Sequence, residues 1–87
     1  MTTRASRLLG ADVVDPHGRR LGKISDLLLE ESPLAGVSYA LVRLEPSPQE
    51  KEHTVAVPWS LLQPGDEERQ LVVGASRETL RRMRSLA

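Results

Sequence analysis

The chain has 87 residues, in which 12 Lys and Arg balance 12 Asp and Glu, and it contains no cysteine. A chain of this length is expected to form one domain over residues 1–87 and to bury only about 60–65% of its unfolded surface, so its core is small. The balanced charge excludes a general attraction to nucleic acid or to an anionic membrane. The lack of thiols excludes disulfides, thiolate nucleophiles and thiolate metal sites.

The N-terminal segment has the composition of neither a signal peptide nor a membrane span. Its apolar stretch around Leu8-Leu9 is far too short for either. We therefore expect a cytoplasmic protein that makes no membrane contact, and we expect residues 1–6 to be flexible.

The first predicted elements are two strands joined by a tight turn. Asp12–Val14 is a short apolar strand. The next four residues suit a type I turn, because Asp15 can accept a backbone N–H two residues on, Pro16 fixes φ, and Gly18 can adopt a positive φ. The returning strand runs from Arg19 to Leu29 and ends at a charged segment that contains proline.

The next predicted strand covers residues 37–44, which are rich in β-branched residues and include the only tyrosine. Side chains alternate between the two sides of a strand. One side therefore carries Ala40, Val42 and Leu44, and the other carries Val37, Tyr39 and Leu41. Since both sides are apolar, we expect both to be covered at least in part, the second by another layer or another subunit.

The second half of the chain begins with a polar loop at 45–52 and continues with a strand at 53–57. Pro58 cannot donate a backbone hydrogen bond, so it should end this strand or place it at a sheet edge. Pro64 and Gly65 suit the two central positions of a type II turn over residues 63–66.

A last strand at 69–73 precedes the only predicted helix. Ser76 is a favourable N-cap, Glu78 lies near the positive end of the helix dipole, and arginines lie toward its negative end. We expect this helix over residues 76–86, including its cap. Five or six short strands with Gly and Pro turns and one capped helix predict a mainly β fold, a small barrel or sandwich with the helix over one end.

Four sequence segments resemble the PRC-barrel family over roughly residues 6–83. Leu9-Gly10 matches the opening of the domain, and residues 15–27, DPHGRRLGKISDL, follow its "d-x-x-G-x-x-l-G-k-v-x-D-l" pattern. Tyr39–Val42 and Val57–Leu62 match its "y-a-v-v" and "v-P-w-x-x-l" elements. The resemblance implies a small PRC-type β-barrel of five or six short, mostly antiparallel strands with one C-terminal α-helix, and it implies protein contact rather than catalysis.

The chain also lacks the features that give two members of this family their particular functions. From these 87 residues we expect neither the N-terminal domain of RimM-type ribosome maturation factors nor the membrane helix of the reaction-centre H subunit. Neither function is therefore expected here in full.

The polar residues give no pattern for an active site or a metal centre. Asp26 has no positioned acid or nucleophile near it in the sequence, so it is expected to accept backbone hydrogen bonds. His17 and His53 lack metal-ligand spacing, and the glycines form no phosphate-binding cluster. We predict no catalytic, cofactor-binding or metal-binding residue, and no enzyme activity.

The apolar residues of the 37–44 strand are the better candidates for a functional surface. We predict that an interface is formed by Val37, Tyr39 and Leu41, together with Leu27 and Leu29 where these point outward. An exposed apolar patch on so small a domain usually binds a partner. The sequence therefore predicts a non-enzymatic protein-binding module, an adaptor or scaffold that forms a homodimer or higher oligomer and contacts an unidentified protein.

The predicted helix offers a second, different candidate surface. Its arginines, Arg77, Arg81, Arg82 and Arg84, could contact phosphates and make the protein an RNA- or ribosome-associated module. The alternative is a solvated helix face. We favour the solvated face, because Tyr39 and Trp59 are the only aromatic residues available for stacking on bases. Leu80, Met83 and Leu86 form the apolar stripe of this helix, which is expected to seal the barrel or a neighbour's groove.

Overall fold

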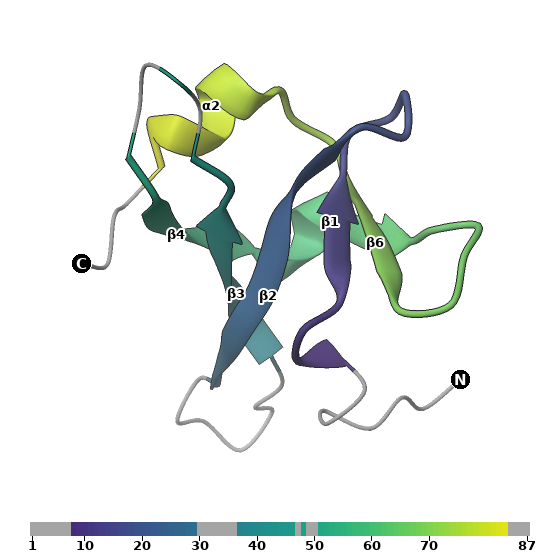
Figure 1. The fold of residues 1–87 in the computed structure, drawn as a ribbon. Coiled ribbons are helices and arrows are strands. Elements are labelled where there is room, and N and C mark those ends of the chain that lie inside the picture. The colour runs from purple at the N-terminus through teal and green to yellow at the C-terminus, as the bar shows by residue number, and fades with distance from the viewer. Residues whose placement is uncertain (1–7, 30–36, 47, 49–50, 84–87) are drawn as a thin grey trace.

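The computed structural model describes residues 8–29, 37–46, 48 and 51–83, without the side chains of residues 29, 37 and 38. The described residues form six strands and one short α-helix, and Figure 1 shows how these elements are arranged. The strands are β1 (Asp12–Val14), β2 (Arg20–Leu29), β3 (Val37–Leu44), β4 (His53–Pro58), β5 (Leu62–Pro64) and β6 (Gln70–Val73). A 3-10 turn, η1 (Trp59–Leu61), joins β4 to β5, and helix α2 (Arg77–Arg81) follows β6.

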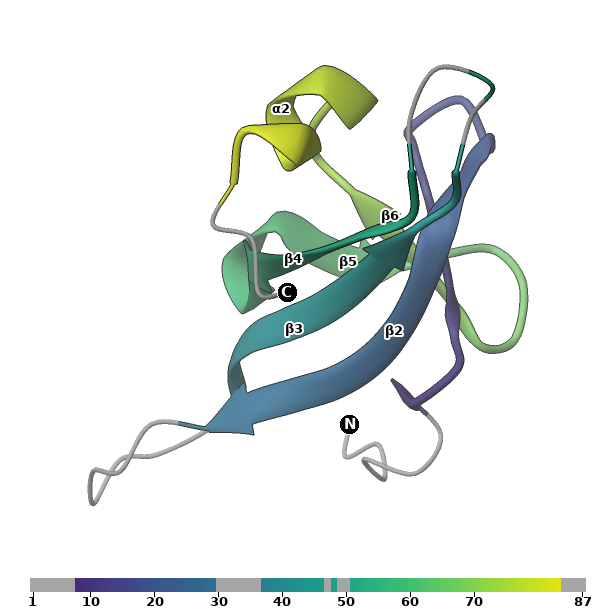
Figure 2. The same ribbon diagram turned by 60° about the vertical axis from the view of Figure 1, so that its left-hand side comes forward.

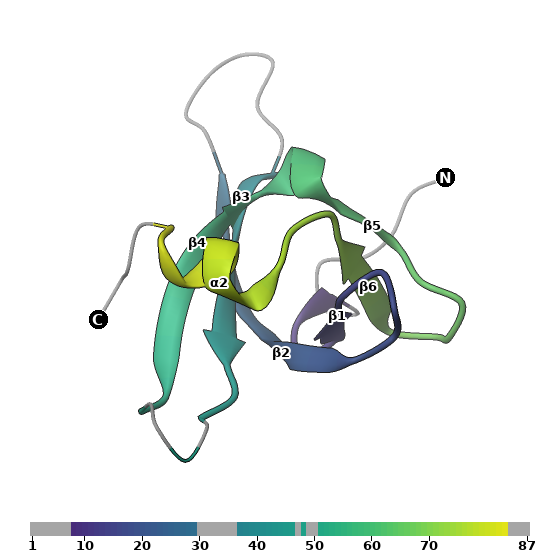
Figure 3. The same ribbon diagram turned by 90° about the horizontal axis from the view of Figure 1, so that it is seen from above.

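All six strands belong to one sheet with the order β4-β3-β2-β1-β6-β5. Strands β1 and β6 run parallel, and every other neighbouring pair is antiparallel. Seen from above, the sheet curls into a half-barrel with α2 over its mouth (Figure 3). The predicted mainly β fold with mostly antiparallel strands is therefore confirmed.

The core lies on the concave side of this sheet. Along β3, Ala40, Val42 and Leu44 are buried on the same side, as the alternation of the sequence predicted. No polar or charged residue among those described is buried. Trp59 packs against the core from η1 and stays partly exposed. The largest fully buried side chains come from five strands and the helix: Val13, Ile24, Val42, Leu44, Val55, Val57, Val73 and Leu80.

The turn between β1 and β2 has the predicted hydrogen bonds. The N–H of Gly18 donates to the carbonyl of Asp15 (2.9 Å), and Gly18 has φ +84°. The Oδ1 atom of Asp15 accepts the backbone N–H groups of His17 (2.8 Å) and Arg19 (2.9 Å). The hydrogen bond from Arg19, followed by that from His17, lowers the pKa of Asp15 below its ordinary value of 3.8.

This lowered pKa gives a prediction for the pH dependence of stability. Because the folded protein favours the carboxylate, Asp15 stabilises it above about pH 3.8 and loses this effect as the pH falls through its folded pKa. At pH 6 we expect the wild-type protein to have a higher urea unfolding midpoint than the Asp15→Asn variant. At pH 3 we expect the difference between the two midpoints to be smaller. A difference that is unchanged between these pH values would contradict the assignment.

The type II turn predicted over residues 63–66 does not form. A type II turn needs a positive φ at Gly65, and Gly65 does not have one. Instead, Pro64 ends β5 opposite Leu71, and the N–H of Gly65 donates to the carbonyl of Gln70 (2.9 Å). The positive φ of this loop occurs at Arg69 (φ 57°), whose guanidinium donates to the carbonyl of Leu9 (2.5 Å). The loop is therefore longer than predicted, and β5 was not predicted at all.

The helix begins where it was predicted and ends earlier. The Ser76 hydroxyl accepts the N–H of Thr79 (3.1 Å), which confirms the N-cap. Helix α2 ends at Arg81 rather than near residue 86, because the N–H groups of Arg82 and Met83 donate three residues back instead of four. Such tightened turns are common at helix ends. Residues 84–87 lie outside the described residues, as do residues 1–6.

Candidate interaction surface

A β-bulge in β2 decides which of its side chains reach the surface. Ile24 pairs with Val42 and Asp26 pairs with Leu41, so Ser25 is an extra residue with no partner in β3. The Ser25 hydroxyl donates to the carbonyl of Leu41 (3.2 Å). After the bulge the alternation of side chains is shifted by one residue.

This shift corrects the predicted interface. Leu27 pairs with the fully buried Ala40 and packs against the core, so it does not belong to the outward side of the sheet. Leu28 takes that position, 37% exposed, and pairs with Tyr39, which is 42% exposed. The side chains of Leu29 and Val37 lie outside the described residues.

The outward side of β2, β3 and β4 forms a surface that we call the outer face. Its side chains form three rows across the strands, set by the pairing of β3 with its two neighbours. The apolar row holds Leu28, Tyr39 and Pro58; the middle row holds Asp26, Leu41 and Ala56; the basic row holds Lys23, Arg43 and Thr54.

The apolar row lies at the end of β2 and β3 that points away from α2 (Figure 2). An antiparallel sheet usually turns polar side chains toward water on the side that does not face the core. Here Leu28 and Tyr39 are adjacent and are two of the three large apolar side chains that the structure describes as exposed. Leu41, in the next row, is partly buried. The outer face therefore exposes two adjacent large apolar side chains that a partner could cover.

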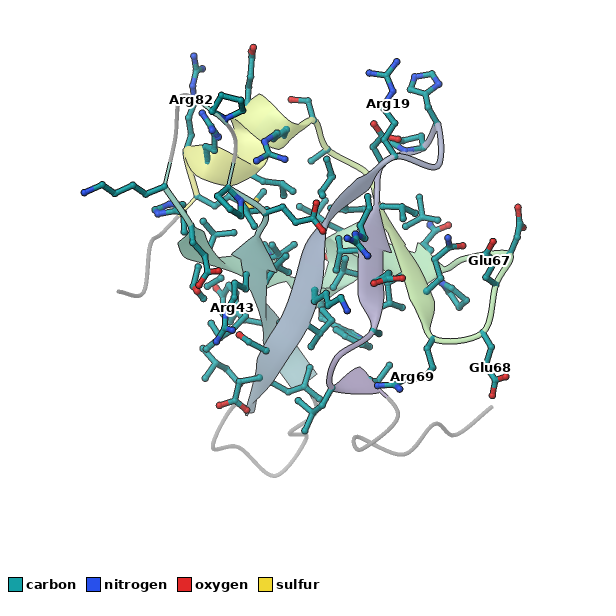
Figure 4. The ribbon with its side chains drawn as sticks, viewed as in Figure 1. Arg19, Arg43, Glu67, Glu68, Arg69 and Arg82 are labelled. Carbon is teal, nitrogen blue, oxygen red and sulfur yellow. The ribbon has the colours of Figure 1, made fainter. Side chains whose placement is uncertain are left out.

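The described arginines of the predicted basic patch do not form one exposed surface. Arg77 is partly buried, and its guanidinium donates to the backbone carbonyl of Glu45, at the end of β3. Arg81 is partly buried and interacts with the rest of the chain. Arg82 is exposed and points away from the barrel (Figure 4). Arg84 lies outside the described residues.

Glu45 links several elements at this end of the barrel. Its N–H donates to the carbonyl of Leu21 (2.9 Å), and its carboxylate forms an ion pair with Arg20 (2.5 Å). Its carbonyl accepts the guanidinium of Arg77. Arg77 therefore has a structural role that the sequence did not indicate: it fastens α2 to β3.

This role predicts that Arg77 contributes to stability whereas its neighbour does not. We expect Arg77→Ala to lower the free energy of unfolding by about 1–2 kcal/mol, because a hydrogen bond from a charged donor is lost. Arg82→Ala, on the same helix, is the matched control and should change stability by less than about 0.5 kcal/mol. Urea unfolding measures both, and equal stability of the two variants would show that Arg77 does not anchor the helix.

The residues considered for chemistry have ordinary structural surroundings. Asp26 Oδ1 accepts the backbone N–H of its neighbour Leu27 (2.8 Å). His17 is exposed at the turn between β1 and β2, and His53 begins β4. Within the described ranges, no three His, Cys, Asp or Glu side chains are placed to hold a metal ion.

The fold and the outer face define a small β-barrel module with an apolar exposed surface. The sequence model of the PRC-barrel domain matches residues 2–80, which is most of the chain. The protein therefore belongs to the PRC-barrel family, as its motifs indicated. A search of curated proteins found no match. None of the helices in the described part of the chain has the length and apolar character needed to cross a membrane.

Proposed function

We propose that this PRC-barrel protein is a non-enzymatic interaction module that self-associates through its outer face. In this proposal the protein works in the cytoplasm as an adaptor or scaffold, and its oligomer presents the remaining surface to a further protein partner. Association would also cover apolar surface that a chain of 87 residues leaves exposed.

The observation that supports the proposal is the apolar row. Leu28 and Tyr39 are paired neighbours on two strands of the sheet, and both are exposed, although the core side of each strand is well buried. Tyrosine is enriched in the centres of protein interfaces, where its ring is buried and its hydroxyl can still find a partner.

The contacts of α2 do not favour the RNA-associated alternative. One of its arginines is used to anchor the helix, and Arg82 is the only one of the four that is described as exposed. Tyr39 lies near the start of β3, whereas Arg77 contacts Glu45 just after the end of this strand, so Tyr39 is not placed to stack on a base bound beside these arginines. Binding to structured RNA in a salt titration tests this alternative, and binding that is absent at low salt excludes it.

Light scattering tests self-association directly. We expect the wild-type protein to associate at tens of micromolar and the double variant Tyr39→Lys, Leu41→Lys to be a folded monomer, since association would have to remove two added charges from water. Gln63→Lys, which also adds positive charge at an exposed position of β5, is the control and should associate like wild type. A wild-type monomer, or a double variant that still associates, would contradict the proposal.

A further inference from the structure

The last part of β2 pairs with a described strand on one side only. Strand β1 pairs with residues 20–23 of β2. Ile24 completes this contact, because its N–H donates to the carbonyl of Ala11 (3.0 Å) and its carbonyl accepts the N–H of Gly10 (2.8 Å). Strand β2 then continues past the beginning of β1 (Figure 1, Figure 2), where the described strands pair with it only on the β3 side. We call this segment, residues 26–29, the β2 edge.

The bulge at Ser25 decides which backbone groups point away from β3 at this edge. In a regular strand, the backbone groups of successive residues bond to opposite sides. Ile24 bonds toward β1, so the residue after it bonds toward β3. The bulge adds one residue at this point, since Ser25 and Asp26 both lie opposite Leu41. Asp26 therefore also bonds toward β3, and the N–H and carbonyl of Leu27 point away from β3.

The side chain of Asp26 occupies the position that an added strand would need. Its Oδ1 atom accepts the N–H of Leu27 (2.8 Å), and the residue is exposed. A strand that pairs with the β2 edge would have to place a carbonyl oxygen on this N–H in place of the carboxylate. That oxygen carries partial negative charge, so the nearby carboxylate would repel it. Charged side chains on edge strands commonly prevent pairing in this way.

The sequence of the β2 edge favours pairing with another chain. Residues 27–29 are three consecutive leucines, and Leu28 is 37% exposed. An exposed apolar edge strand readily pairs with the same strand of a second molecule, and a flanking charge opposes this. We infer that Asp26 closes the β2 edge against strand pairing with a second copy of this chain. The inference is independent of the proposed function, because it concerns backbone groups at the β2 edge and not side chains of the outer face.

Amide hydrogen exchange of Asp26→Ala tests this role, because it reports on each N–H separately. Asp26 is exposed, so the variant is expected to fold. At a concentration where wild type is monomeric, the Leu27 amide should exchange at least about tenfold faster in the variant, since a hydrogen bond to a charged group is lost. At higher concentration, light scattering should show that the variant associates more strongly than wild type. The Leu27 amide should then regain protection, whereas that of Leu28, which bonds toward β3, should not change.

The matched control is Glu67→Ala, which removes the same charge at an exposed position between β5 and β6 and should behave like wild type. A Leu27 amide that exchanges equally slowly in Asp26→Ala and wild type would overturn the inference. So would an Asp26→Ala variant that associates no more strongly than wild type, or one that associates while Leu27 stays unprotected. A wild-type protein that remains monomeric at all concentrations would refute the proposed function but not the role of Asp26.

Discussion

Replacing Gly22 with alanine is expected to destabilise the protein by about 3 kcal/mol or more. A Cβ atom at Gly22 would lie 2.3 Å from the carbonyl oxygen of Arg43 and 3.0 Å from the Cα of Leu44, both in the backbone of β3. These atoms cannot move aside without disturbing the longest pair of strands in the sheet. Because a domain of this size is stable by only about 4–13 kcal/mol, the loss should be large in urea unfolding.

The matched control for this substitution is Gly74→Ala. A Cβ at Gly74 would meet only the carbonyl oxygen of Leu61, at 3.9 Å, which is ordinary contact. We expect this variant to unfold within about 1 kcal/mol of wild type. If Gly22→Ala were as stable as Gly74→Ala, β2 and β3 would not approach each other as closely as the structure shows.

The second large effect is expected for Leu80→Ala. Leu80 is the one residue of α2 that is fully buried, and it completes the core against the sheet. Truncating a buried leucine costs about 2–5 kcal/mol, because apolar contacts are lost and a cavity remains. Thermal and urea unfolding measure the loss. A loss below about 1 kcal/mol would mean that α2 is not a part of the core.

Local turn and capping chemistry made several elements predictable from the sequence. The turn around Asp15 and the N-cap at Ser76 depend on residues two to four positions apart, so the sequence contains all the information that they need. The bounds of β3 were predicted in full, because its apolar residues alternate between a core side and an outer side. Pro58 ends β4, and β4 is the last strand at one edge of the sheet, as a missing N–H group requires.

The elements that were mispredicted depend on contacts between distant residues. The bulge at Ser25 adjoins Ile24, whose N–H donates to the carbonyl of Ala11 and whose carbonyl accepts the N–H of Gly10. The Pro64-Gly65 pair was assigned a local turn, but pairing with β6 extends Pro64 into a strand. In both cases hydrogen bonds between distant segments determine the backbone conformation. No pattern of neighbouring residues in the sequence reveals these hydrogen bonds.

The candidate surface was predictable in part for the same reason. The outward position of the Tyr39 side chain was predictable, because side chains alternate along β3 and this strand pairs with β4 without a register shift. Leu28 was missed in favour of Leu27, since the alternation read from the sequence does not include the bulge at Ser25. The anchoring role of Arg77 was missed as well, because it depends on the position of Glu45, which follows a strand distant in sequence.

The claim that the outer face mediates self-association is tested most directly by sedimentation velocity of two single variants. Leu28→Lys places a charge in the apolar row, whereas Gln63→Lys places the same charge on an exposed position of β5. We predict that Leu28→Lys is a folded monomer at concentrations where wild type and Gln63→Lys associate. Association of a folded Leu28→Lys variant with the strength of wild type would contradict this account.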